Sequence, residues 1–134
     1  MVSSYEEKVI SLLQKGKIKF EREKHFSDLR KGKYRFDFYI EDGRAIEVQG
    51  QQHYQFISKF YRSRAEFEAA KERDRRKISY CLAHRIPLYI IPYWELENLS
   101  TAADLFQSRF FASTRWKNDL DWQHYQNLTK RCKI

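Results

Sequence analysis

The chain contains little cysteine, proline or glycine: two, two and four residues among 134. So little proline and glycine excludes a collagen-like or low-complexity chain. Cys81 and Cys132 form no CxxC pair and have no zinc-ligand spacing, so we expect reduced thiols and no structural zinc. No apolar run approaches the roughly 20 residues of a membrane span, and the first residues include acids where a signal peptide needs bases. These absences predict a soluble cytoplasmic protein that is not secreted and has no membrane partner.

Aromatic and basic residues are abundant instead. The 16% aromatic content argues against disorder, and a chain of 134 residues suits one compact domain. We expect a single domain over 1–134, with a core at about 4–112 and an aromatic, basic C-terminal extension at about 113–134. The net charge of +8 favours a polyanionic partner, with nucleic acid first. Basic ribosome-associated and membrane-surface proteins share such a charge, so charge alone does not identify the activity.

Hydrophobic periodicity predicts alternating helices and strands. The first helix should run from Ser4 to about Lys15, with Ser4 as N-cap, Glu7 as its capping-box partner and Gly16 at its end. Two strands with one solvent-exposed face follow, and then a third strand after a turn at Asp42 and Gly43. The expected strand ranges are 17–26, 33–40 and 44–49.

The second half of the chain should contain a long helix at about 63–85, a strand at 87–92 buried on both faces, and a turn with a helix within 93–111. The inward residues expected in this last helix are Leu99, Ala103, Phe106 and Phe110. Asp74 interrupts the apolar stripe expected along the long helix, which otherwise consists of Phe67, Ala70, Ile78, Cys81 and Leu82.

The apolar pattern also predicts the register of the hairpin formed by the second and third strands. A two-residue loop would mix apolar and charged side chains on each face, which is unfavourable. A loop with one more residue, in which Gly43 takes a positive φ, keeps them apart. In that register Asp37 lies directly opposite Glu47, while the apolar pairs are Phe36 with Val48 and Phe38 with Ile46. Like charges opposite each other destabilise a sheet, so something must offset this repulsion.

Oxygen and imidazole groups are therefore expected to converge at one end of the sheet. The candidates are Asp37, Glu47, Asp74 and His53, which immediately follows the third strand. Clustered carboxylates suit a hard cation such as Mg²⁺, or alternatively Mn²⁺. Such an ion would relieve the repulsion, and it would polarise a phosphodiester and lower the pKa of an attacking water.

Four stretches in this order resemble the PD-(D/E)xK nuclease superfamily, and in particular its very-short-patch-repair and EDxHD homing endonuclease branch. They span about 4–94 and read Ser4-x-x-Glu7-Lys8, Arg35-Phe36-Asp37-Phe38-Tyr39, Ala45-Ile46-Glu47-Val48-Gln49-Gly50 followed by Gln51-Gln52-His53-Tyr54, and Lys71-Glu72-Arg73-Asp74-Arg75-Arg76-Lys77. The resemblance implies a restriction-endonuclease-like α/β fold, a mixed sheet flanked by helices. It also implies a Mg²⁺-dependent DNA endonuclease, a hydrolase of a prokaryotic or phage-infected cell.

The resemblance also implies a role for each acid. Asp37 would be the central metal ligand, and Glu47 a second ligand or the group that positions the attacking water. Glu7 would be the acid of the first helix near the metal, and Asp74 the acid of the long helix. His53 would be the acid/base or phosphate-contacting group.

One position departs from the superfamily pattern. Much of the superfamily has a lysine two residues after the second acid, where this chain has Gln49. Glutamine can orient a water or a phosphate, but it cannot hold a positive charge or shuttle a proton. Either His53 or a basic neighbour takes the role of the lysine, or the site is impaired. Gln51 is a further candidate for a water or phosphate contact.

Basic residues near the predicted site are candidates for contacts with DNA phosphates. Arg35 precedes the first acid, and Lys71 and Arg75 belong to the charged cluster on the long helix. Charge runs are usually solvated faces, so this signal is weak.

Structural readings of the same residues stay open. Glu7 can serve only in a capping box, and His53 only in a structural hydrogen bond. The two strand acids can form a solvated pair neutralised by Arg35 or Arg44. Asp74 can pair with Arg75 or Lys71.

Three other functions also stay open. One is a catalytically impaired nuclease-fold module that binds nucleic acid, and another is a basic interaction protein with no nucleic-acid role. The third is a structure-specific nuclease for branched DNA, for which a homodimer would suit a two-fold substrate.

Overall fold

The computed structural model describes residues 3–50 and 62–112, apart from one helical side chain. Two of the predicted site residues, Gln51 and His53, and the C-terminal extension lie outside the described residues. The helices and strands are α1 (Ser4–Lys15), β1 (Phe20–His25), β2 (Arg35–Ile40), β3 (Ala45–Gln49), α2 (Arg64–Ala83) and β4 (Leu88–Pro92). Short 3₁₀ helices are η1 (Arg30–Gly32), η3 (Tyr93–Asn98), η4 (Ala102–Phe106) and η5 (Ser108–Phe110).

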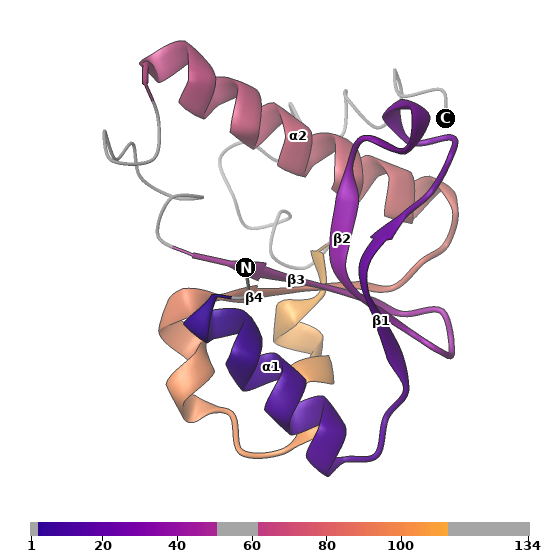
Figure 1. The fold of residues 1–134 in the computed structure, drawn as a ribbon, viewed down its shortest axis with the longest axis vertical. Coiled ribbons are helices and arrows are strands. Elements are labelled where there is room, and N and C mark those ends of the chain that lie inside the picture. Colours follow the sequence, from indigo (N-terminus) through magenta and orange to yellow (C-terminus); the bar gives the residue numbers. More distant parts are fainter. Residues whose placement is uncertain (1–2, 51–61, 113–134) are drawn as a thin grey trace.

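The four strands form one mixed sheet in the order β1-β2-β3-β4. The first three strands are antiparallel neighbours, and β4 pairs with β3 in parallel after the crossover through α2. Figure 1 shows α1 and the C-terminal 3₁₀ helices on one side of the sheet and α2 on the other. The expected mixed α/β architecture is therefore confirmed. No helix of the described part is both long and apolar enough to cross a membrane.

Helix α1 begins at the predicted residue, but its cap lies one position earlier than expected. Ser3, not Ser4, is the N-cap, and its side-chain oxygen accepts a hydrogen bond from the Glu6 backbone N–H at 3.1 Å. The buried face of the helix consists of Val9, Leu12 and Leu13. Glu6 lies three residues before Val9 and hence on this face, where it is half-buried.

The hairpin between β2 and β3 has the predicted register. Phe38 pairs with Ile46, one step from the position where Asp37 faces Glu47. The loop closes where the Ile40 N–H donates to the Arg44 carbonyl at 2.7 Å, so its three residues are 41–43. Gly43 adopts a φ of +97°, as expected for the last residue of such a loop.

Strand β3 is buried on both faces, and all five of its residues are buried. One apolar cluster lies toward α1 and contains Phe38, Ile46 and Val48. The other cluster lies toward α2 and contains Phe36, Ala45, Leu88 and Ile90. Alternate residues of a strand point to opposite faces, so the side chains that neighbour Ile46 and Val48 must face α2. This arrangement brings Glu47 and Gln49 under the long helix.

Phe36 and Phe38 belong to different clusters although they are two residues apart. Residues at this spacing share a face in a regular strand. The change of cluster shows that β2 turns at Asp37, which lies between them. Across the β1–β2 ladder the residue opposite this position is Glu23, whose backbone has a positive φ of 51°.

Two predictions about the second half of the fold are wrong in detail. The segment after β4 forms 3₁₀ helices, so the buried residues recur every three positions, at Leu99, Ala102 and Leu105, while Ala103 is exposed. On α2, Ala70 and Asp74 are half-buried. Among the described side chains of this helix, the buried ones are Phe67, Arg75, Ile78, Ser79, Tyr80 and Cys81.

We predict that Gly43→Ala destabilises the protein by about 1–2 kcal/mol, because an L-residue is strained at this positive φ. A Cβ here would lie 3.8 Å from the Tyr39 hydroxyl, an ordinary contact, so the effect isolates the backbone. Urea unfolding measures the change, with Glu41→Ala in the same loop as the control. Equal stability of the Gly43→Ala variant and the wild type would contradict the loop conformation.

Candidate active site

The side chains of Asp37 and Glu47 lie together on one face of the sheet. They occupy opposed positions on β2 and β3, one step beyond the Phe38–Ile46 pair. Their carboxyl groups are close enough to share a hydrogen bond. The Val48 backbone N–H donates to Asp37 Oδ2 at 2.8 Å. The structure thus brings together the two acids that the hairpin register predicts.

Lys77 of α2 supplies the positive charge that this pair requires. Its Nζ donates to Glu47 Oε1 at 2.8 Å, and the two side chains are only 14% and 10% exposed. Burial alone would lower the pKa of Lys77, yet this pKa is raised because Glu47 contacts it and two further acids, Asp74 and Asp37, lie nearby. The ammonium group is therefore strongly held in its charged form.

The two arginines considered as counter-charges have other partners. Arg35 lies 3.6 Å from Glu23, and Arg44 lies 2.8 Å from Asp42. The acid pair is therefore not a solvated hairpin pair neutralised by its own strands. A helix that follows 30 residues later in the chain provides the cation.

The environment of Asp37 favours its protonated form. Burial is the largest cause that raises its pKa well above the usual range, and the negative charge of Glu47 acts in the same direction. The hydrogen bond from the Val48 N–H and the charge of Lys77 oppose this shift without reversing it. The neighbouring carboxyl group of Glu47 therefore makes ionisation of Asp37 less favourable.

Two other predicted residues lie beside the pair. Gln49 is buried and, two residues after Glu47 on β3, projects to the same face. Asp74 is half-buried on α2, about one helical turn from Lys77, and its charge contributes to the raised pKa of that lysine. The structure therefore brings Asp37, Glu47, Gln49 and Asp74 into one region.

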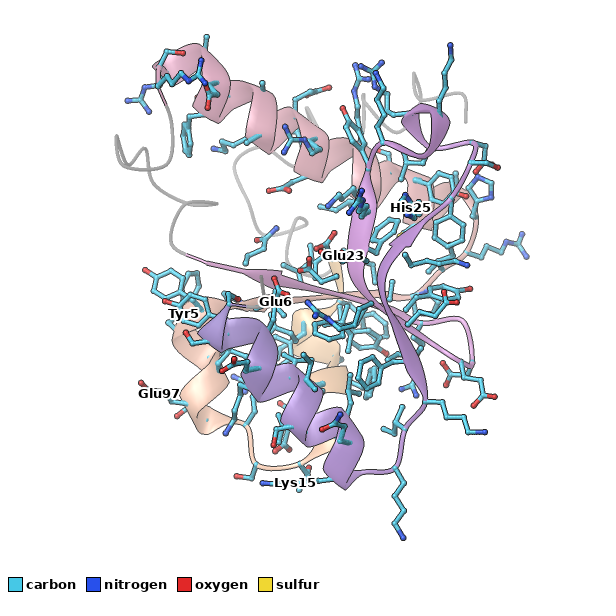
Figure 2. All side chains as sticks on the ribbon, viewed as in Figure 1. Tyr5, Glu6, Lys15, Glu23, His25 and Glu97 are labelled. Carbon is cyan, nitrogen blue, oxygen red and sulfur yellow. The ribbon has the colours of Figure 1, made fainter. Side chains whose placement is uncertain are left out.

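Glu6, and not Glu7, is the acid of α1 that faces this region. Glu7 is exposed, whereas burial and then the charge of Asp37 raise the pKa of Glu6. Arg22 forms an ion pair with Glu6 and opposes that shift. Figure 2 shows Glu6 and Glu23 near the place where α1 approaches β1 and β2.

The residues that sequence reasoning missed carried weak signals. Lys77 stands in a run of charged residues, which usually marks a solvated helix face. The signal for Glu6 was its spacing of three from Val9, which places it on the buried face of the helix.

The three predicted phosphate contacts have different environments. Arg35 is exposed, and Lys71 is half-buried with its Nζ 5.6 Å from the centre of the Phe67 ring. Arg75 is only 8% exposed and lies 3.9 Å from Glu72. Among these three, Arg35 is the residue best presented to a ligand in the described part of the chain.

The acid pair meets the smallest requirement for a magnesium site. Mg²⁺ commonly binds one or two carboxylates and completes its shell with water and substrate oxygens. Asp37 and Glu47 supply two such groups in mutual contact. Within residues 3–50 and 62–112 no group of three or more metal-ligating side chains gathers at one point. The residues present therefore fit an ion that keeps most of its water, not one enclosed by protein.

No family model matches the chain, and neither the curated proteins nor the solved structures contain a significant match.

We predict that Asp37→Asn changes how stability depends on pH. The pKa of Asp37 is raised in the folded protein. Such an acid contributes less to stability as the pH rises from its pKa in the unfolded chain to its pKa in the folded protein. The variant cannot ionise but still offers an oxygen to the Val48 N–H. In EDTA the stability of the variant relative to the wild type should rise progressively from pH 4.5 toward pH 8, as measured by urea unfolding.

The control for this measurement is Asp42→Asn. Its hydrogen bonds with Arg44 lower the pKa of Asp42, so its contribution to stability is lost as pH falls, the opposite sign. A constant difference between Asp37→Asn and the wild type across this pH range would contradict the raised pKa of Asp37.

Lys77→Met should destabilise the protein by about 3 kcal/mol at pH 7, because it leaves Glu47 buried without its cation. The matched control is Lys71→Met on the same helix, for which we expect a change within about 0.5 kcal/mol. Thermal and urea unfolding measure both changes. Similar losses for the two variants would show that Lys77 is not the counter-charge of the pair.

Proposed function

We propose that the protein is a metal-dependent endonuclease that hydrolyses DNA phosphodiester bonds, with a fold of the PD-(D/E)xK type. The observation that carries the proposal is the close contact between Asp37 and Glu47, with Lys77 on the second acid. Two acids and a lysine at the centre of a mixed sheet have the ligands and the charge that phosphodiester hydrolysis needs. The net charge of +8 supports a nucleic-acid substrate.

In this proposal Asp37 and Glu47 hold one Mg²⁺ or Mn²⁺ ion. When bound, the ion polarises the phosphodiester and lowers the pKa of a water molecule. The Val48 N–H holds the Asp37 carboxyl group through Oδ2. Glu47 is oriented by Lys77 through Oε1 in the same way. The backbone and α2 thus preorganise both acids.

Lys77 takes the role of the lysine that much of the superfamily has at the position of Gln49. Its ammonium group lies at Glu47, where a cation can contact the scissile phosphate and stabilise charge that develops on it. The Gln49 amide can orient water from the same face. Asp74 maintains the charge of the lysine, and His53 and Gln51 keep their predicted roles as acid/base and phosphate contact.

The impaired module is the second candidate, and Gln49 is the observation that favours it. If Lys77 only neutralises Glu47, the site holds two acids and a cation but lacks a group that activates water. Such a protein would bind DNA through its basic surface without cutting it.

Asp37→Asn distinguishes these functions. We expect the wild type to nick plasmid or branched DNA in Mg²⁺ or Mn²⁺ and not in EDTA. The variant should lose cleavage by at least about 100-fold, because it lacks a ligand charge. Its affinity for DNA in EDTA should stay or rise, since a negative charge near the substrate is removed. Gel assays of nicking and fluorescence anisotropy measure the two effects.

Asp42→Asn, which removes a charge from the hairpin loop, is the control and should cleave normally. DNA binding without cleavage by the wild type in either metal would support the impaired module. Cleavage that persists in EDTA, or an Asp37→Asn variant as active as the wild type, would overturn the proposed mechanism. Binding that does not weaken as salt rises would indicate a partner other than nucleic acid.

A further inference from the structure

The Tyr34 ring lies near two arginines that come from distant parts of the chain. The Cζ atom of Arg30 in η1 lies 5.8 Å from the centre of the Tyr34 ring, and that of Arg73 in α2 lies 5.9 Å away. A shared aromatic ring can favour two guanidinium groups by cation–π attraction, but it does not neutralise them. The two positive charges therefore remain available to anionic groups.

Four basic residues in η1, beside Tyr34 and on α2 have no acidic partner within the part of the chain that the structure describes. Arg30, Lys31, Lys33 and Arg73 are all exposed, and none forms an ion pair with an acid among the described residues. Other basic side chains of the region do have such partners, as Arg35 has Glu23 and Arg76 has Glu72. We call these four residues together with Tyr34 the η1 patch.

The backbone presents the patch at an energetic cost. Arg30, Lys31 and Gly32 have successive φ values of 48°, 53° and 78°. Glycine adopts such angles readily, whereas arginine and lysine are strained there. The turn is fixed by His25, whose Nδ1 lies 2.9 Å from the Gly32 carbonyl oxygen. Two long cationic side chains thus occupy positions where glycine would be more stable.

The patch adjoins the acid pair on two elements. Arg73 precedes Lys77 by four residues on α2, so the two share a helix face about one turn apart. Tyr34 directly precedes β2 and lies three residues before Asp37. Tyr34 thus lies just before the strand that carries Asp37, and Arg73 lies on the helix that carries Lys77, the partner of Glu47.

We infer that the η1 patch binds the phosphodiester backbone of the DNA strand that enters the acid pair, without reading its bases. The inference rests on the proposed function. Guanidinium groups recognise phosphate oxygens by paired hydrogen bonds. The Tyr34 ring already contacts two cations, so it is not offered to a base for stacking. Contacts of this kind position a strand and carry no sequence information.

The test compares Arg30→Gln/Arg73→Gln with a control that loses the same charge. Lys15→Gln/Lys19→Gln removes two exposed cations, and Figure 2 shows Lys15 at the end of α1 far from α2. Fluorescence anisotropy in EDTA measures binding of a labelled duplex between 50 and 250 mM NaCl. The slope of log affinity against log salt should fall by about two for the patch variant, one per lost phosphate contact. The control should keep nearly the wild-type slope. The same results are expected for a second duplex of unrelated sequence, because the patch does not read bases.

Lys31→Gly should change stability and DNA binding in opposite directions, which a purely structural role of Lys31 would not do. Relief of the strained φ should raise the melting temperature, while loss of the cation weakens DNA binding. A variant that binds DNA as tightly as the wild type would count against the patch.

The outcomes separate this inference from the proposed function. If the salt dependence of DNA binding falls by the same amount in the patch variant and in its control, the patch has no special role. This conclusion would hold even if the wild type cleaves DNA. A selective loss for the patch variant supports the patch, even where no metal supports cleavage and the proposed hydrolysis fails.

Discussion

The contact between two carboxylates, on Asp37 and Glu47, is the constraint on which the rest of the structure depends. Like charges on opposed strands repel, and burial strengthens this repulsion. The fold contains three responses to it. The Val48 N–H binds one acid, Lys77 binds the other, and Asp37 favours the protonated state. Each response uses a group whose position depends on the architecture around it, since the hairpin loop sets the register and α2 covers β3. A buried acid pair is costly for a protein, and the proposed divalent ion would offset that cost.

Several features follow from the sequence by simple physical rules. The alternation of apolar residues in 35–49 permits one register, and the positive φ of Gly43 makes the loop that this register needs. The apolar strand between two prolines is buried on both faces, and it lies beside β3 in the sheet. Leu99 and Phe110 are buried as expected, but burial of Ala103 was wrongly predicted, because a 3₁₀ helix repeats every three residues and an α-helix every 3.6.

The counter-charge could not be predicted in this way. Lys77 is one of five basic residues within seven positions, and only the docking angle of α2 decides which of them reaches β3. Whether Glu6 or Glu7 faces the acid pair depends on a shift of one residue along the helix. The N-cap is Ser3 and not the predicted Ser4, so the predicted acid was also one residue too late. Sequence patterns report local periodicity well, whereas they report poorly on contacts that need two elements to meet at a defined angle.

The central claim is that the two acids bind one divalent ion, and that Asp37 gives up its proton when they do. Calorimetric titration of Mn²⁺ into the wild type at pH 7.5, in buffers of different ionisation enthalpy, tests it most directly. The account predicts one ion per chain, with a heat that varies between buffers because protons are released. It also predicts that both Asp37→Asn and Glu47→Gln abolish this binding. Unchanged stoichiometry in either variant, or no uptake by the wild type, would contradict the account.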